Sequence, residues 1–136
     1  MQLTRGCEYA IRGLVYLGSE KQGDPILLSN IAEAIGAPTN YLSNIFQVLT
    51  KLGLVSSHRG ARRGYTLTRA PKKINLLEIV EGLEGPIRVA SFTQNGGADA
   101  DCPMFKVWND IEESIEKKLS RATLARLTKS SFLPKK

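Results

Sequence analysis

The sequence is poor in the residues that cross-link a chain or carry it across a membrane. It contains two cysteines, Cys7 and Cys102, among 136 residues, so no disulfide framework is expected. No apolar run reaches the roughly 20 residues that a membrane-spanning helix needs, and no secretory signal is visible. A chain of this length can bury a core without disulfides. These absences indicate a single folded unit in the cytoplasm with no membrane partner.

Residues typical of catalytic centres are also scarce. His58 is the single histidine. There is no phosphate-binding glycine loop, no evident pair of catalytic carboxylates and no set of ligands at metal-binding spacing. We therefore expect no catalytic residues and no metal site, and the protein is predicted not to be an enzyme.

Acidic residues are outnumbered, and only in one half of the chain. Residues 1–73 hold ten Lys/Arg against four Asp/Glu, whereas residues 74–136 hold nine of each, so the first half carries the whole net charge of +6. Neutralising phosphates and releasing their counterions is a main source of nucleic-acid affinity. The asymmetry favours double-stranded DNA as the partner of the first half, with a solvated basic surface as the alternative.

What the sequence does contain is a helix-turn-helix pattern within residues 28–69. Ile31, Ala34 and Ile35 repeat at helical spacing behind Ser29, a candidate N-cap, and Gly36 should end this helix. A second helix is expected over residues 39–52. Its predicted inward face is Tyr41, Leu42, Ile45, Val48, Leu49 and Leu52; its predicted outward face is Asn40, Ser43, Asn44, Gln47 and Lys51.

A basic hairpin is predicted to follow. Gly53 suits the end of the second helix, and residues 54–58 and 65–68 are typical of strands on either side of the loop 59–64. A helix-turn-helix followed by a hairpin is a winged helix. Before it, residues 4–20 should form a helix capped by Thr4, and residues 26–28 a short edge strand.

The second half should add helices. Asn75 and Glu78 have the spacing of a capping box for a helix over residues 75–83, and Thr123 can cap a last short helix. A polar loop over residues 86–101 is the expected place for a sensor. From Pro103 a long helix has one apolar stripe: Phe105, Trp108, Ile111, Ile115 and Leu119. We expect this helix to pack on a second subunit; the alternative is that it folds back on its own domain.

The predicted fold is therefore mainly α with a small β-hairpin wing. Residues 1–73 would form a winged helix-turn-helix DNA-binding domain, and residues 74–136 a connector helix, a sensor-type loop and a dimerisation helix. A two-fold homodimer would place two recognition helices about one DNA turn apart, or a multiple of it, on a palindromic operator.

Several short motifs follow one another along the chain: Met1-Gln2-Leu3-Thr4, Tyr9-Ala10, Tyr41-Leu42, Gly53-Leu54-Val55, Arg59-Gly60, Gly64-Tyr65-Thr66-Leu67, Cys102 with Trp108, and Thr123-Leu124. Their order and spacing resemble the Rrf-two family of bacterial winged-helix repressors, which includes iron–sulfur, nitric-oxide and cysteine-metabolism regulators. The likeness covers nearly the whole chain.

The resemblance implies a homodimeric transcription factor, with the second helix in the major groove and the wing in the adjacent minor groove. The DNA-binding residues would be Thr39, Asn40, Tyr41, Ser43 and Asn44 on the helix, and Arg59, Arg62 and Arg63 on the wing. The chemistry agrees independently, because asparagine amides can pair with adenine and arginine suits a narrow minor groove. Asparagines that are merely exposed on the helix are the alternative.

Two departures from the family affect the wing and the sensor. Arg63-Gly64 replaces the usual Gly-Gly pair before Tyr65, which makes the wing more basic. Cluster-binding members carry three cysteines before the long helix; Cys102 matches the last, and no thiol stands near Ala90 or Gly96. The candidate ligands for an iron–sulfur cluster are thus only Cys102, Glu8 and Cys7, and no cofactor is predicted.

The control of the regulator therefore stays open at this point. The leading expectation is a repressor without its own cluster that responds to a small molecule or a protein effector. The alternatives are an iron–sulfur or thiol-based redox sensor that uses Cys102, which precedes a helix N-terminus that favours thiolate, and a winged-helix module for protein–protein interaction.

Overall fold

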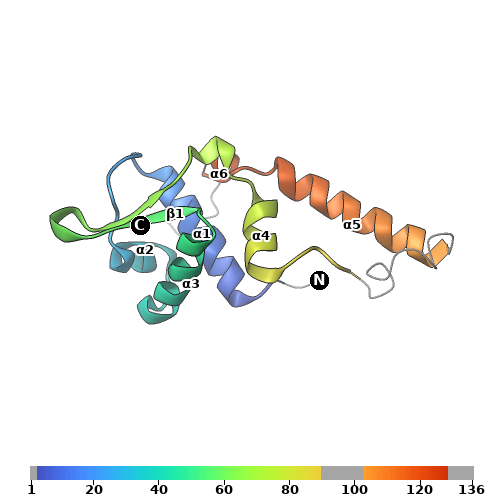
Figure 1. The fold of residues 1–136 in the computed structure, drawn as a ribbon, viewed down its shortest axis with the longest axis horizontal. Coiled ribbons are helices and arrows are strands. Elements are labelled where there is room, and N and C mark those ends of the chain that lie inside the picture. Colours follow the sequence, from blue (N-terminus) through green and yellow to red (C-terminus); the bar gives the residue numbers. More distant parts are fainter. Residues whose placement is uncertain (1–2, 90–102, 129–136) are drawn as a thin grey trace.

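The structure, a computed structural model, describes residues 3–89 and 103–128. It confirms the predicted class, a mainly helical chain with one small hairpin (Figure 1). Most of the polar loop expected over residues 86–101 lies outside the described residues, as does Cys102. The elements are α1 (Arg5–Ser19), α2 (Leu28–Ile35), α3 (Thr39–Lys51), β1 (Val55–His58), β2 (Gly64–Leu67), α4 (Leu76–Glu84), α5 (Pro103–Arg121) and α6 (Leu124–Leu127), with two short 3-10 helices, η1 (Gly60–Arg62) and η2 (Pro71–Lys73).

The boundaries of the first helices follow local chemistry, with one correction. The Thr4 side chain accepts a hydrogen bond from the Cys7 amide at 3.1 Å and caps α1 as predicted. Gly36 adopts a left-handed conformation (φ 72°) and ends α2. The prediction that Ser29 caps α2 is wrong, because the helix already begins at Leu28 and Leu27 occupies the cap position without a side-chain acceptor.

The wing is an antiparallel pair that is joined to the chain ahead of α2. Val55 faces Leu67 and His58 faces Gly64 in the β1–β2 register. The edge strand predicted over residues 26–28 is a single bridge, in which Ile26 and Tyr65 exchange two backbone hydrogen bonds of 3.0 and 2.9 Å. The hairpin is thereby held against the entry to α2.

The core is one apolar cluster to which most elements contribute. Phe46 of α3 and Leu14 of α1 lie in it with Ile79 of α4 and Leu124 of α6. Both proposed halves of the chain therefore share a core, and the functional division at residue 73 stays a prediction. Among the described residues, no helix combines the length and apolarity that crossing a bilayer requires.

The buried face of α3 differs from the predicted one. Leu42, Ile45 and Leu49 are buried as expected, together with Phe46, which the pattern did not assign. Tyr41, Val48 and Leu52 were predicted to face inward, yet they are 44%, 40% and 39% exposed. Phe46 fills the space beside Gly13 of α1, where an added Cβ would lie 2.9 Å from the ring, so the helix is turned with that side toward the core.

The starts of α4 and α6 are each fixed by hydrogen bonds. Asn75 accepts from the Glu78 amide at 3.0 Å, but the Glu78 carboxylate pairs with Arg69, so only half of the predicted capping box forms. The Leu124 amide donates to the Ile74 carbonyl at 2.9 Å, and Thr123 caps α6 as predicted. Between these points α5 extends away from the body (Figure 1).

Candidate nucleic-acid interface

The outward face of α3 is polar and carries no carboxylate. Asn40, Asn44, Gln47 and Lys51 are exposed and lie opposite the buried face of the helix. Thr39 is exposed beside them, and Ser43 is half-buried at the edge of the face. Because amides and hydroxyls both donate and accept hydrogen bonds, this face can pair with base edges without repelling phosphates.

Tyr41 is directed away from this face. Its ring packs edge-on against Tyr9 of α1, with centroids 5.8 Å apart and an interplanar angle of 74°. Its hydroxyl lies over Gly6, where an added Cβ would be 3.1 Å away. Tyr41 thus joins α3 to the start of α1.

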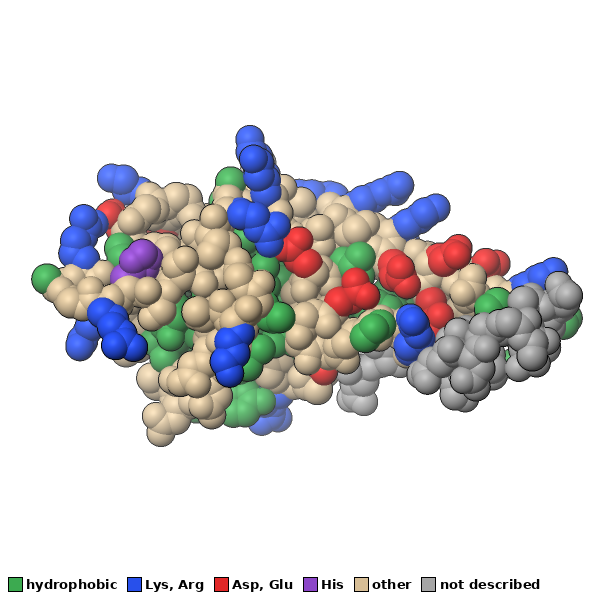
Figure 2. All heavy atoms as spheres, in the orientation of Figure 1, with side chains coloured by type: hydrophobic (Ala, Val, Ile, Leu, Met, Phe, Trp, Pro, Cys, Tyr) green, Lys and Arg blue, Asp and Glu red, His purple; other side chains and the backbone are tan. Residues whose placement is uncertain are grey.

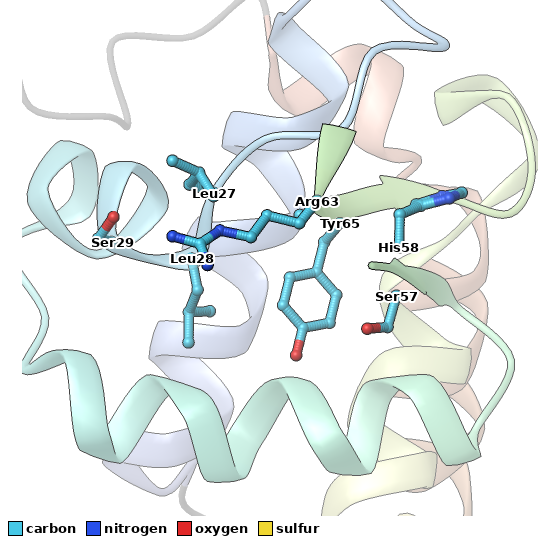
Figure 3. A pocket seen from close by; sticks show the side chains of 8 residues that line it. Leu27, Leu28, Ser29, Ser57, His58, Arg63 and Tyr65 are labelled. Carbon is cyan, nitrogen blue, oxygen red and sulfur yellow. The ribbon is translucent and has the colours of Figure 1, made fainter. Parts of the chain in front are cut away.

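The three arginines of the wing are exposed, but they differ in their surroundings. Arg62 forms an ion pair with Asp24, Nη2 to Oδ1 2.5 Å, in the loop between α1 and α2. Arg63 instead extends over Leu27 and Leu28 toward α2 (Figure 3). On the face shown in Figure 2, acidic side chains gather over α4 and α5, where Lys and Arg side chains also lie, whereas the charged side chains at the wing end are mainly Lys and Arg. The charge asymmetry of the sequence is therefore also an asymmetry in space.

His58 is part of the hairpin rather than of a metal site. Its Nε2 lies 2.8 Å from the Thr66 Oγ1 on the neighbouring strand, and the residue is exposed. Among the described residues there is no group of three or more histidine, cysteine or acidic side chains that could hold a metal ion.

Cys7 is a core residue. It is 1% exposed, and burial, followed by the nearby charges of Glu84 and Glu8, raises the pKa of its thiol from 9.0 to about 11. At neutral pH the thiol is therefore protonated and a poor nucleophile or metal ligand. Glu8 is exposed and, with Arg12 and Leu76, lines a small pocket between α1, α4 and α6.

Sequence reasoning placed Gln47 on the outward face of α3 but left it out of the DNA-binding residues. It shares that exposed face with Asn44, three residues away. Glu112 stands outside the predicted apolar stripe of α5, yet it is only 4% exposed, and its Oε1 accepts from the Val89 amide at 2.7 Å. No local pattern announces such a buried carboxylate, because its partner lies 23 residues away.

A helix-turn-helix whose second helix has an exposed amide face, placed beside a cationic hairpin, defines a winged-helix DNA-binding protein. A profile of the Rrf2 family, whose description is iron-dependent transcriptional regulator, matches residues 3–130. The chain belongs to the Rrf2 family, and it is a DNA-binding transcriptional regulator.

Individual relatives agree with this membership. The HTH-type transcriptional regulator IscR of Xenorhabdus nematophila is 30% identical over 132 residues, which cover 96% of this chain and 80% of that protein. The solved structure of CymR, the global cysteine regulator of B. subtilis, has a TM-score of 0.81 at 26% identity and covers 94% of this chain and 96% of its own. The solved structure of T. potens IscR has a TM-score of 0.75 at 32% identity. The match covers 95% of this chain and 87% of that protein's chain.

The family description implies iron, and the thiols of this chain do not fit a cluster held by three or four cysteines. The whole sequence supplies two thiols, Cys7 and Cys102. Cys7 is buried in the core with a raised pKa, so it would have to leave the core and ionise in order to bind iron.

Proposed function

We propose that the chain acts as a homodimer that binds a palindromic operator and represses transcription. One observation carries the proposal: α3 presents Asn40, Asn44 and Gln47 on a carboxylate-free face directly beside a hairpin with three arginines. In this arrangement α3 enters the major groove, where asparagine and glutamine amides recognise adenine, and the wing follows the neighbouring backbone or minor groove. Thr39 and Ser43 supply hydroxyls at the edge of the same face.

The dimer is proposed to form through α5. Ile115 and Leu119 of the predicted stripe pack against the chain's own core. Met104, Val107 and Ile111 are instead the large apolar residues exposed on this helix, at intervals of three and four residues, which places them on one side. A helix that leaves three large apolar side chains in water gains free energy when a second copy covers them. Two-fold symmetry then presents both α3 helices to one side of the duplex.

The signal is proposed to be a small molecule, a protein partner or a thiol reaction at Cys102, rather than an iron–sulfur cluster. Two thiols, one of them in the core, give a cluster too few ligands. The regulator would act in the cytoplasm, where the bacterial chromosome lies, and would carry no enzymatic activity.

The experiment begins with an operator selected by the wild-type protein from a library of randomised duplexes. Asn44→Ala should weaken binding to the selected duplex by about 1–3 kcal/mol and leave binding to random duplexes unchanged. Asn109→Ala on α5, whose amide donates to Glu113 at 3.2 Å, is the matched control and should have no effect. Equal losses on both duplexes for Asn44→Ala would refute base reading.

Two further measurements test the assembly and the sign of regulation. Val107→Glu should convert the dimer to a monomer in sedimentation and abolish operator binding, because it places a charge in the apolar contact. A reporter gene downstream of the selected operator should be silenced by the wild-type protein. Activation of the reporter would refute repression, and a monomeric wild-type protein would refute the dimer.

A further inference from the structure

Resting on the proposed function, we propose that a pocket between the wing and α2 binds one backbone phosphate of the duplex and that Arg63 is its anchor. The pocket has a volume of about 290 Å³, and its polar lining includes Ser29 of α2, Ser57 of β1 and Arg63 of the wing. Arg62, by contrast, is already paired with the Asp24 carboxylate. The wing arginines would thus have different roles rather than forming one interchangeable cluster.

The pocket is built by a close approach of two backbones. The Ile26–Tyr65 bridge joins β2 to the segment that enters α2. At Gly64 (φ 138°) an added Cβ would lie 2.5 Å from the Ile26 carbonyl oxygen, so only glycine allows this separation. Arg63 immediately precedes this contact, and its backbone is therefore held at a fixed position relative to α2.

The guanidinium of Arg63 has no acidic neighbour in this pocket. None of the residues that line it is Asp or Glu, and within residues 3–89 and 103–128 Arg63 forms no ion pair. Figure 3 shows its side chain extending between Leu27 and Leu28 toward the hydroxyl of Ser29. The corresponding charges of Arg62 and Arg69 are each paired with a carboxylate. Arg63 is therefore a wing cation that no carboxylate of the described residues neutralises.

The surroundings of Arg63 also favour an anion. The N-terminal end of α2 carries a partial positive charge, and Leu27 provides no side-chain acceptor for the first amides of the helix. A guanidinium directed at this end is unfavourable on its own, because both carry positive charge. An anion placed between them would be attracted to both and could accept from the hydroxyl of Ser29 as well.

The position of the pocket identifies the anion as a phosphodiester of bound DNA. α3 runs beneath Leu28 and Tyr65, two of the residues that line the pocket (Figure 3). A duplex whose major groove receives α3 must carry its backbone past the helices and hairpin that flank the groove. A phosphodiester offers two anionic oxygens, which suit a forked guanidinium and a hydroxyl.

The test measures binding of full-length Arg63→Ala, Arg63→Lys and Arg62→Ala to the selected operator and to a random duplex over a salt series. Arg63→Ala should lose about tenfold in affinity on both duplexes, as expected for a charge-assisted hydrogen bond. The plot of the logarithm of the binding constant against the logarithm of the salt concentration has a negative slope, and its magnitude should decrease by about 0.9 for each subunit. Arg62→Ala, the matched control, should lose at most about threefold because its charge is already paired. Arg63→Lys should retain the salt slope.

A second measurement locates the contact. Methylphosphonate linkages remove the charge of single phosphates along the operator. At one position along the operator, the methylphosphonate should lower the DNA affinity of the wild-type protein about tenfold. It should leave the affinity of Arg63→Ala unchanged, because that variant already lacks the guanidinium that would contact the phosphate. Circular dichroism of Arg63→Ala should match that of the wild type, since the side chain is exposed.

Three outcomes would overturn the proposal. Loss of affinity on the operator alone would make Arg63 a base reader. The absence of any phosphate whose neutralisation is masked by Arg63→Ala would remove the proposed contact. Inorganic phosphate that displaces DNA from the wild type but not from Arg63→Ala, at constant ionic strength, would make the pocket a site for a free anion. Failure of the wild type to prefer any selected duplex would instead refute the proposed function.

Discussion

Gly64→Ala is expected to destabilise the protein far more than an ordinary glycine substitution in a loop. The new Cβ would lie 2.5 Å from the oxygen and 2.6 Å from the carbonyl carbon of Ile26, distances that non-bonded atoms do not adopt. Backbone atoms cannot rotate aside as a flexible side chain can. Relief therefore requires the hairpin to move away from the chain ahead of α2.

The cost has two parts. Separating the chains breaks the two hydrogen bonds between Ile26 and Tyr65, each worth about 0.5–1.5 kcal/mol. Holding alanine at φ 138° adds strain of about 1–3 kcal/mol. The ring of Tyr65 packs on buried Phe46 with centroids 5.0 Å apart, so displacement of the hairpin also disturbs the core. The expected loss in the free energy of unfolding is about 3–5 kcal/mol.

Gly60→Ala is the matched control. Gly60 lies in the same hairpin with φ 89°, but an added Cβ would meet nothing within 4 Å. The Gly60→Ala variant tests the conformational strain without the close approach to another backbone. Its free energy of unfolding is expected to fall by about 1–2 kcal/mol. Urea unfolding followed by circular dichroism at fixed protein concentration measures both losses. Equal destabilisation by the two variants would refute the close-approach argument.

Three other perturbations probe the charge on the wing, the core thiol and a helix cap. Asp24→Ala should raise DNA affinity about threefold on any duplex, because it frees Arg62 and removes a negative charge beside the phosphates, as an anisotropy titration would show. The free energy of unfolding should fall as the pH rises from 9 to about 11, because the unfolded Cys7 thiol ionises before the folded one. Urea unfolding at pH 8 and 10 checks this, and Cys7→Ala should remove that part of the pH slope. Asn75→Ala should cost about 1 kcal/mol, since the Glu78 amide loses its acceptor; thermal unfolding measures it.

Each of these expectations has a clear contrary result. Weaker DNA binding by Asp24→Ala would show that the ion pair holds the wing in its binding position. An unchanged pH slope in Cys7→Ala would assign the alkaline loss to other groups. A cost for Asn75→Ala no larger than that for Glu81→Ala, a substitution in the middle of α4, would show that the cap contributes little.

The recognition surface was predictable in part. Helical spacing alone placed Asn40 and Asn44 on the exposed side of α3, because both are polar and lie one turn apart. The same spacing misplaced Tyr41, Val48 and Leu52, which border the apolar stripe. Which side of a broad stripe faces inward depends on how closely the neighbouring helix approaches. That approach is set by Gly13, whose lack of a side chain leaves room for Phe46.

The sequence by itself determined the features that need only neighbours in the chain. Thr4 and Asn75 cap their helices through amides three residues ahead, and Gly36 ends α2 because glycine tolerates a left-handed conformation. The order of the helices, the presence of the hairpin and the excess of positive charge in residues 1–73 likewise follow from composition and residue spacing.

Only the tertiary structure decided which charges are free. Arg62 and Arg63 are adjacent in sequence and chemically identical, yet Arg62 meets Asp24 from 38 residues away and Arg63 turns toward α2. Glu112 looks like a surface carboxylate until α5 brings it to the Val89 amide. These differences arise from contacts between segments distant in the chain, which depend on how the helices pack around the core and leave no mark in local sequence.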